Sequence, residues 1–417
     1  MKILVIGSGA REHAICEALS SDSNQIFCAP RNDGMNHSGI RTVPILENDF
    51  EGLVNFAIKE NIAFTIVGPE EPLVNGVVDF FEAHGLRIFG PNKKAARIEG
   101  SKAFTKSLLK LASIPTAEFC EFTEFSLAEK YIKRKSDYPL VIKADGLAAG
   151  KGVYIVENQD DALNVVSELL NSHKFETHKV VIEEYLDGEE FSLMAFVNNG
   201  KFYPMPAAQD YKKLNNGDKG PNTGGMGAVC PVKNISESIY NQAINKVLKP
   251  FVDILVEEGI KYTGVLYAGL ILTNKGIKVI EFNVRFGDPE TEVVLPRLQT
   301  NLSNVIFSIL NDDIPEIHWK NSGLDLGVFI SSKGYPEAPI KDATLGSTES
   351  FDSLNCKINY AGIKMKDTSF WTNGGRLFVL KTHSENLLDA QREIYTNVKK
   401  LDHTNIFYRT DIGNNSI

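Results

Sequence analysis

The first hundred residues alternate between short apolar strands and helices, and no other feature constrains the fold as strongly. The expected strands are 2–6, 26–29, 64–67 and 86–89, and the expected helices lie near 11–19, 50–60 and 74–84. Helical crossovers between strands predict a parallel sheet with helices on both faces. In such a Rossmann-like sheet, ligands bind at the carboxyl ends of the strands.

The rest of the chain forms further units, because 417 residues are too many for one hydrophobic core. Ser101 is expected to cap a helix that runs to about Ala112. Further strands are predicted at 140–144, 153–156, 180–183, 191–197, 264–272, 278–284, 326–330 and 376–380, and further helices at 160–170, 236–258, 291–310 and 387–401.

This pattern predicts a multidomain protein that combines α/β and α+β parts. An N-terminal α/β domain is expected at 1–101, and a middle region at 102–320. A smaller α+β unit, 119–188, belongs to the middle region, and a small C-terminal α/β module follows at 325–417.

Composition excludes several classes of protein. Apolar residues make up 43% and charged residues 23%, which is ordinary for a soluble globular chain. The net charge is −9 without a long basic tract, so we expect no binding to nucleic acid. The longest apolar runs have the length of a strand, and the chain enters a strand at its first residues. We therefore expect neither a membrane span nor a signal peptide, and a cytoplasmic location.

The cysteines and the first turn exclude two kinds of site. Five cysteines lie at least twelve residues apart, without metal-ligand spacing, so we expect reduced thiols. The turn at 7–12 resembles the dinucleotide fingerprint, but Glu12 stands where its third glycine belongs, which argues against a nicotinamide cofactor. A helix N-terminus after a glycine turn still binds anions. Two interpretations remain, a phosphate-bearing substrate and a merely tight turn.

A glycine-rich tract, Lys143-Ala-Asp-Gly-Leu-Ala-Ala-Gly-Lys-Gly152, separates two predicted strands. Glycines at 146, 150 and 152 let backbone N–H groups approach phosphate oxygens, and lysines add positive charge. No Gly-Lys-Ser/Thr opens a helix here, so this is not a Walker A loop. The tract predicts a phosphate site, and a plain hairpin loop is the alternative.

The strand at 278–284 carries polar residues on one face. Alternation places Ile280, Phe282 and Val284 in the core and Glu281 with Asn283 on the opposite face, beside Arg285 at the strand end. Two oxygen ligands beside a guanidinium suit Mg²⁺ and an anion. A half-exposed strand of mixed polarity is the alternative, although Asn disfavours strands.

Two other segments allow more than one interpretation. Residues 181–190 end a strand with an acidic linker, which could be a solvated turn. Residues 209–227 are long, polar and rich in glycine, which is typical of a functional lid or a disordered linker. Tyr211 and Met226 favour a lid that is mobile without ligand.

Taken in order, these tracts resemble the ATP-grasp superfamily and, within it, the phosphoribosylamine–glycine ligase family, over essentially the whole chain. The matching tracts are 9–14, 67–70, 72–74, 100–106, 141–152, 220–228 and 281–291. The tracts around 143 and 281 suit many ATP-grasp proteins, whereas Arg-Glu-His at 11–13 and Asn-Thr-Gly-Gly-Met at 222–226 single out this family. The C-terminal module is matched mainly at 372–376 and 409–413, which leaves its role open.

The resemblance implies a two-lobed ATP-grasp core and an ADP-forming ligase of purine biosynthesis. Such an enzyme transfers the γ-phosphoryl group of ATP to the carboxylate of glycine. The amine of 5-phosphoribosylamine then attacks the glycyl phosphate to form the amide. Activation is needed because hydroxide is a poor leaving group, and catalysis rests on positioning and charge neutralisation.

The resemblance also implies roles for individual residues. The nucleotide-binding residues it implies are Lys102, Lys143, Gly146, Gly150, Lys151, Gly152, Glu183, Glu184, Leu186 and Glu190. The lysines would hold phosphates, Glu183 and the backbone near Leu186 would face adenine, and Glu190 would contact the ribose. Glu281 and Asn283 would hold Mg²⁺, or Mn²⁺ in its place.

The remaining implied residues serve the other substrates. Arg285 and Asp288 would act as catalytic residues near the activated carboxylate, and the substrate phosphate is expected near 9–11 and 68–70. The substrate-binding residues are Gly9, Arg11, Glu12, Gly68, Pro69, Glu70, Asp210, Asn222, Thr223, Gly224, Gly225 and Met226. The expected partners are the small-molecule substrates, ATP, glycine and 5-phosphoribosylamine, with a transient contact to the enzyme that makes the last.

Two alternatives stay open. Another ATP-grasp ligase, such as a carboxylase that activates bicarbonate, would differ in the substrate that stimulates ADP release. A regulatory protein that binds ATP without turnover would release no ADP with any cosubstrate. Intact Lys143, Glu281 and Asn283 argue against the second, because a decayed enzyme loses its metal ligands first.

Overall fold

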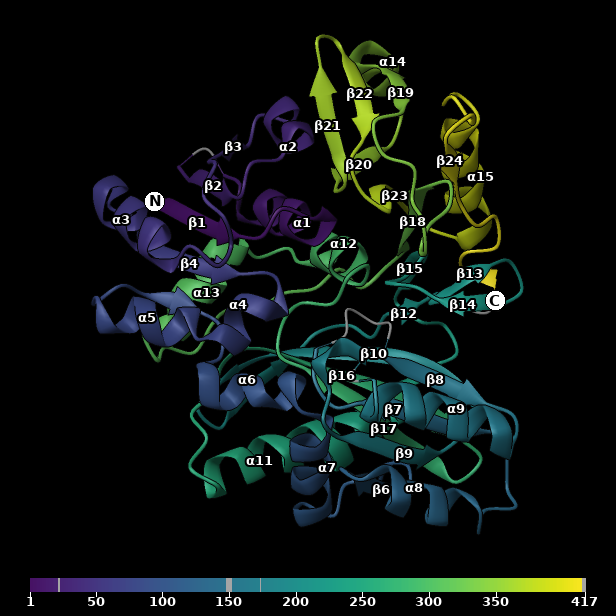
Figure 1. Ribbon diagram of the computed structural model, residues 1–417. Helices are drawn as coiled ribbons and strands as arrows, with labels where there is room; N and C mark the ends of the chain where they lie inside the picture. Colours follow the sequence, from purple (N-terminus) through teal and green to yellow (C-terminus); the bar gives the residue numbers. More distant parts are fainter. Residues whose placement is uncertain (22, 148–151, 173, 415–417) are drawn as a thin grey trace.

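In the computed structural model, which describes residues 1–21, 23–147, 152–172 and 174–414, the N-terminal unit is a five-stranded parallel sheet in the order β3-β2-β1-β4-β5 (Figure 1). Its elements are β1 (Lys2–Ile6), α1 (Ala10–Leu19), β2 (Gln25–Ala29), α2 (Asp33–His37), β3 (Arg41–Thr42), α3 (Phe50–Glu60), β4 (Phe64–Val67), α4 (Glu70–Asn75), α5 (Val77–Ala83) and β5 (Ile88–Phe89). The predicted parallel sheet is confirmed. β1 pairs with β4, so the turns at 7–9 and 68–70 lie at the same edge.

Two predicted helices are interrupted. The helix near 74–84 is divided into α4 and α5, because Gly76 between them has φ 96°, a left-handed conformation that ends a helix. The segment 291–310 forms α12 (Thr291–Val294), the short 3-10 helix η3 (Leu295–Arg297) and α13 (Leu302–Leu310). Pro296 lacks the N–H group that would continue α12.

Two helices, α6 (Lys93–Gly100) and α7 (Lys102–Leu111), lead to a small lobe. Ser101 caps α7 as predicted, because its Oγ accepts a hydrogen bond from the N–H of Phe104 at 3.2 Å. The lobe is an antiparallel sheet in the order β6-β9-β7-β8, and α8 and α9 pack on it through an apolar cluster. Its elements are β6 (Phe119–Phe122), α8 (Phe125–Ile132), β7 (Leu140–Ala144), β8 (Val153–Val156), α9 (Gln159–Leu170), η1 (Lys174–Glu176) and β9 (Val180–Glu184).

The central sheet lies next to this lobe and is antiparallel, in the order β11-β10-β16-β17 (Figure 1). Its elements are β10 (Glu189–Asn198), β11 (Lys201–Pro204), α10 (Glu237–Ala243), the π-helical turn η2 (Ile244–Leu248), α11 (Lys249–Glu257), β16 (Thr263–Thr273) and β17 (Gly276–Asn283). Gly269 pairs with Glu281 but Leu270 pairs with Val279, so Ile280 is the extra residue of a β-bulge. The prediction that Ile280 lies in the core was wrong for this reason, and Val279 is buried instead.

The C-terminal sheet includes two strands from the middle of the chain. Its order is β12-β15-β18-β23-β20, with β24 also paired to β18. These elements, their associated hairpin and their neighbours are β12 (Gln209–Asp210), β13 (Lys213–Asn215), β14 (Lys219–Asn222), β15 (Gly227–Cys230), β18 (Leu324–Ser332), β19 (Thr344–Ser347), α14 (Thr348–Asp352), β20 (Lys357–Tyr360), β21 (Ile363–Lys366), β22 (Ser369–Thr372), β23 (Arg376–Ser384), α15 (Leu387–Val398) and β24 (Ile406–Phe407). Because β12 and β15 flank residues 211–226, that segment is attached to the C-terminal module.

Residues 211–226 form the β13–β14 hairpin beside the C-terminal end of the chain (Figure 1). Tyr211 and Met226 are buried at its base. The fully buried guanidinium of Arg409 bonds Asp218, near the hairpin tip, at 2.8 Å. Of the two interpretations of this segment, the disordered linker is wrong, because the C-terminal module supplies anchors that the segment itself lacks. The lid that is mobile without ligand stays a prediction.

His13 of α1 joins the N-terminal unit to the C-terminal module. Its Nδ1 accepts a hydrogen bond from the N–H of Tyr360 at 2.9 Å, and the two rings stack with centroids 5.7 Å apart. One turn along, Glu17 forms an ion pair with Lys381 of β23 at 2.6 Å. Burial lowers the pKa of His13 to about 4, although Glu17 opposes this shift. The contact therefore uses the neutral imidazole.

We expect His13→Gln to remove part of the pH dependence of stability. The folded pKa of His13 lies below its unfolded value, so the neutral residue contributes stability that is complete above pH 6.5 and is lost as the pH falls towards 4. Between pH 7 and pH 5 this loss amounts to about 2 kcal/mol. Urea unfolding at both pH values should show a smaller fall for the variant than for the wild type. Equal falls would contradict the prediction.

All five cysteines are free thiols, as predicted, and Cys16, Cys28 and Cys230 are buried. Within the described ranges, no helix is long and apolar enough to cross a membrane.

Candidate functional site

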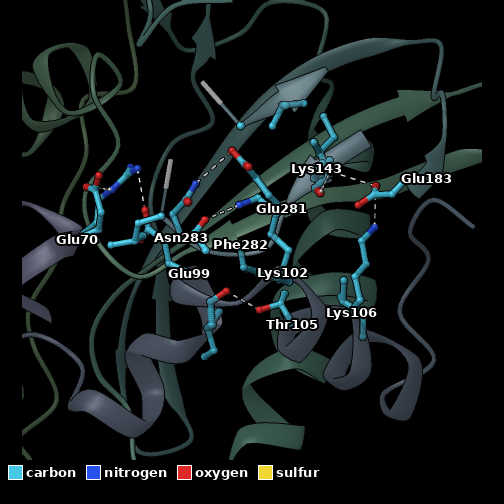
Figure 2. Close-up of a pocket in the computed structure, with 18 residues that line it drawn as sticks. Glu70, Glu99, Lys102, Thr105, Lys106, Lys143, Glu183, Glu281, Phe282 and Asn283 are labelled. Atoms are coloured by element: carbon cyan, nitrogen blue, oxygen red, sulfur yellow. Dashed lines mark hydrogen bonds and ion pairs between the residues drawn. The ribbon is translucent and has the colours of Figure 1, made fainter. Parts of the chain in front are cut away.

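A cavity lies between the small lobe and the central sheet, where β7 and β9 face β17 (Figure 2). It consists of an inner pocket, next to α6 and α7, and an outer pocket of about 670 Å³. The residues that line both pockets are Lys143, Val153, Glu183, Ile280, Glu281, Asn283 and Arg285. Glu70 also reaches the inner pocket, so the N-terminal unit contributes to the same cavity.

Glu281 is surrounded by lysines. Burial by itself would raise the pKa of this carboxyl, but the positive charges of Lys212, Lys143 and Lys102 outweigh burial and hold the pKa below its ordinary value. Glu281 is therefore an ionised carboxylate among three ammonium groups. This arrangement suits a divalent cation that is bound together with phosphate groups.

Asn283 lies beside Glu281, as the two-residue spacing predicts. Its Nδ2 donates to Glu281 Oε1 at 3.4 Å (Figure 2). Turning the amide over would bring its oxygen to the same point, and these two orientations are nearly indistinguishable in shape. The two side chains fit Mg²⁺, which takes one or two protein ligands and completes its octahedron with phosphate oxygens and water. No group of three or more His, Cys, Asp or Glu suited to a metal occurs in the described part of the chain.

Lys143 and Lys106 hold Glu183 from two sides. Their Nζ atoms lie 3.1 and 3.0 Å from Glu183 Oε2 (Figure 2). Lys143 also donates to the carbonyl of Ile280 at 3.2 Å. The other oxygen of Glu183, Oε1, is buried and has no hydrogen-bond partner among the described residues. It can accept a bond from a ligand donor, such as the amine of a purine base.

Lys102 and the glycine-rich tract border the inner pocket. Lys102 Nζ donates to the carbonyl of Gly146 at 2.9 Å. Gly146 has φ 133°, a conformation that favours glycine, and it lines the pocket together with Gly152. The predicted phosphate contacts Gly150 and Lys151 lie outside the described residues.

Arg285 forms a second charged cluster with Glu70 and Glu99. Its guanidinium lies 3.0 Å from Glu99 and 3.4 Å from Glu70. Burial raises the pKa of Glu99 to about 7 against the attraction of Arg285, and Glu99 also accepts the N–H of Val284 at 2.8 Å. The two carboxyl groups hold the Arg285 guanidinium at the carboxyl end of β17, where its planar donors could bind a carboxylate or a phosphate group.

Three of the other carboxyl groups that line the outer pocket belong to Asp210, Asp288 and Glu290. Glu290 accepts hydrogen bonds from the hydroxyls of Ser192 and Tyr267 at 2.7 and 2.8 Å. Oδ1 of Asp210 and Oδ1 of Asp288 are buried without a hydrogen-bond partner among the residues described. Because a buried polar atom without a partner is costly, these two oxygens are positions where a cationic or N–H ligand would be stabilised.

The residues predicted to bind substrate in the N-terminal unit are Gly9, Arg11, Glu12, Gly68, Pro69 and Glu70. Glu12 accepts the N–H of Gly9 and the Nε–H of Arg11, both at 2.6 Å. A Cβ atom at Gly68 would overlap Glu12 Oε1, so close packing here requires glycine. Glu12 therefore caps α1 in the interior instead of facing a ligand, whereas Glu70 lines the cavity.

The end of β9, the linker after it and the start of β10 contribute Glu184, Leu186 and Glu190, in that order, to the outer pocket. The carboxylate of Glu184 pairs with Lys278 at 2.5 Å, and that of Glu190 pairs with Lys212 at 2.9 Å. Apolar residues from both lobes complete the walls: Val141, Val153, Ile155, Tyr185, Ile271 and Ile280. Such walls suit a flat base.

The glycine-rich segment 222–226 divides between the cavity and the core. Asn222, Thr223 and Gly224 line the outer pocket, as does Asp210. Met226 is fully buried in the C-terminal core, and its N–H and C=O are bonded to backbone groups. Met226 thus packs away from the cavity, contrary to the predicted substrate contact.

Sequence reasoning missed several residues of this site. Lys106 follows Lys102 by four residues, and this spacing on one helix could have identified it. Glu99 and Lys212 gave no signal, because their chain neighbours do not show which partners they meet. Glu290 lies in the matched tract 281–291 without an assigned role. Arg376 lies in the matched tract 372–376 without an assigned role.

Comparison with known proteins identifies the family. Models of the phosphoribosylglycinamide synthetase N domain, ATP-grasp (A) domain and C domain match residues 1–99, 100–291 and 325–415. A phosphoribosylamine–glycine ligase of Listeria innocua is 48% identical over 418 residues, with 99% of both chains covered. One of Lactococcus lactis is 48% identical over 422 residues, with all of both chains covered. The chain belongs to the phosphoribosylamine–glycine ligase family.

Solved structures agree with this assignment. A phosphoribosylamine–glycine ligase from Thermotoga maritima superposes with a TM-score of 0.86 at 32% identity and covers 99% of this chain and 100% of that one. The biotin carboxylase domain of a Hydrogenobacter thermophilus 2-oxoglutarate carboxylase, solved with MgADP and bicarbonate, gives a TM-score of 0.74 at 15% identity over 97% of this chain and 91% of that one. The second likeness shows a shared fold, which in the phosphoribosylamine–glycine ligase family is the ATP-grasp fold.

Proposed function

We propose that the chain joins glycine to 5-phosphoribosylamine through a glycyl phosphate, forming glycinamide ribonucleotide, ADP and phosphate. One observation carries the proposal: the ionised Glu281, with Asn283 beside it, lies among Lys102, Lys143 and Lys212 in one cavity. This arrangement matches the needs of phosphoryl transfer, in which charge on the phosphate oxygens must be neutralised and the reactants aligned.

The nucleotide would lie across both pockets. Its base would fit between the apolar walls of the outer pocket, with a donor group facing Glu183 Oε1. Its phosphates would extend towards Lys143 and Lys102. Mg²⁺, or Mn²⁺ in its place, would be held by Glu281 and Asn283 and would neutralise charge on the phosphate oxygens.

Glycine would be activated near Arg285. An oxygen of its carboxylate forms a bond to the γ-phosphorus while the bond from that phosphorus to the β-phosphate oxygen breaks, and ADP leaves. Arg285, oriented by Glu70 and Glu99, would hold the carboxylate and the transferred phosphoryl group. Asp288 follows Arg285 by three residues in the sequence. The open oxygens of Asp210 and Asp288 would accept hydrogen bonds from the glycine amine.

The second step uses the amine of phosphoribosylamine. Its nitrogen attacks the carbonyl carbon of glycyl phosphate, the carbon–oxygen bond to phosphate breaks, and the nitrogen loses a proton. The N-terminal unit, which reaches the cavity through Glu70, would hold the phosphoribosyl group. Because this substrate is labile, we also propose transient contact with the enzyme that supplies it.

The test is ADP release by the purified chain with Mg²⁺, glycine and freshly prepared phosphoribosylamine, each omitted in turn. We expect rapid ADP release only in the complete mixture. Stimulation by bicarbonate in place of glycine would indicate a carboxylase. Tight ATP binding without ADP release under any condition would indicate a regulatory protein and would refute the proposal.

A further inference from the structure

Arg376, the first residue of β23, connects the C-terminal module to the wall of the outer pocket. Its Nη2 lies 2.6 Å from Asp288 Oδ2. Its Nη1 donates to the carbonyls of Gly224 and, at 3.3 Å, Gly225. One side chain of the C-terminal module thus contacts both the 224–225 backbone and Asp288, which are more than sixty residues apart in the sequence.

The surroundings of Arg376 leave its guanidinium little freedom. The Phe329 ring lies against it, with its centroid 4.3 Å from Cζ. Gly224 lies so close that a Cβ atom there would be 3.0 Å from Cζ of Arg376. A Cβ atom at Gly225 would overlap Pro289 and stand 2.7 Å from Asp210 Oδ1. The guanidinium of Arg376 therefore packs against the backbone at 224–225, where a side chain larger than that of glycine would not fit.

Arg376 also determines which oxygen of Asp288 is open. Oδ2 is taken by the guanidinium, whereas Oδ1 is buried, has no hydrogen-bond partner among the residues described, and belongs to a residue of the cavity wall. An arginine fork fixes the plane of a carboxylate more strictly than a lysine does, because its donors are rigidly arranged. A change at Arg376 would let this carboxylate rotate.

We propose that Arg376 is a positioning residue of the ligase reaction, which orients Asp288 and the 222–225 backbone so that the glycine amine is held in the outer pocket. The C-terminal module is in this way part of the active site. This inference rests on the proposed function, because it takes glycine as the ligand of that pocket.

The test compares Arg376→Gln and Arg376→Lys with wild type in the complete ADP-release assay. We expect the KM for glycine to rise about 10- to 100-fold in Arg376→Gln, since a charge-assisted bond that orients the site is lost. The KM for ATP should stay within about twofold, because Arg376 does not touch the lysine-rich end of the cavity. Arg376→Lys should recover only part of the glycine affinity.

The matched control is Lys381→Gln. Lys381 lies on the same strand and is also a buried cation in an ion pair, but it faces Glu17 of the N-terminal unit. The substitution Lys381→Gln should lower the melting temperature without changing the KM for glycine. An equal rise in that KM for Lys381→Gln, or a wild-type KM for Arg376→Gln, would overturn the proposal by leaving Arg376 a general structural role.

A double-mutant cycle covers the case in which Arg376→Gln does not fold. The effects of Arg376→Lys and Asp288→Asn on the KM for glycine should be less than additive, because each change disturbs the same carboxylate. Additive effects would overturn the proposal. If instead wild type releases no ADP in response to glycine, the proposed function itself fails, and that result is distinct from every variant outcome.

Discussion

Replacing Glu281 with glutamine should lower turnover by about a hundredfold or more, because the metal and the phosphates it neutralises lose their anionic protein ligand. Glutamine keeps the shape and one oxygen but removes the charge. The Mg²⁺ concentration that gives half-maximal rate should rise by about tenfold or more. Affinity for metal-free nucleotide should change little, or increase, because three lysines then lose their carboxylate neighbour.

Phe282→Leu is the control for this change. Phe282 borders the inner pocket, but its buried ring stacks on Phe251 in the apolar core, with ring centroids 3.8 Å apart. Its replacement should cost about 1 kcal/mol of stability and leave the Mg²⁺ dependence unchanged. A wild-type rate and Mg²⁺ dependence in Glu281→Gln would show that β17 is structural and that the metal assignment is wrong.

Replacing Lys143 with glutamine should reduce ligation by about 10²- to 10³-fold, the usual effect of losing one donor that stabilises transition-state charge. Lys143 also pairs with the buried Glu183, so the free energy of unfolding should fall by about 1–3 kcal/mol. Lys106 still holds Glu183, which keeps the carboxylate from being left unpaired. ATP raises the melting temperature because it binds only the folded state. This rise should shrink in the variant, because its affinity for ATP is lower.

Lys179→Gln provides the comparison for Lys143→Gln. Lys179 precedes β9 in the same lobe, and its ion pair with Glu121 at 3.2 Å is partly exposed to solvent. Such a pair contributes at most about 1 kcal/mol, and its loss should affect neither ligation nor stabilisation by ATP. If ATP stabilised Lys143→Gln as much as wild type, Lys143 would not be a phosphate ligand.

The local sequence pattern was sufficient to predict those features that depend only on residues close together in the chain. The parallel sheet, the capping of α7 by Ser101, and the two strands β7 and β8 on either side of the glycine-rich tract all follow from spacing within a few residues. The pairing of Glu281 with Asn283 also follows, because two residues along a strand return to the same face. The prediction for Ile280 failed because it depended on the neighbouring strand. A β-bulge in the pairing with β16 turns this side chain out of the core.

The sequence by itself therefore determined the order of the units, the family tracts and the adjacency of Glu281 and Asn283, which we propose hold the metal, since each is carried by residues close together in the chain. Only the tertiary structure decided that Lys212 lines the same pocket as Glu281, that Glu99 pairs with Arg285, and that Arg376 pairs with Asp288. These partners are 69, 186 and 88 residues apart, and no local period connects them. Lys212 and Arg376 reach the wall of the cavity because β12, β15 and β23 share one sheet, and Glu99 meets Arg285 because α6 packs against β17. Buried charges are tolerated at these places because each has a partner of opposite charge.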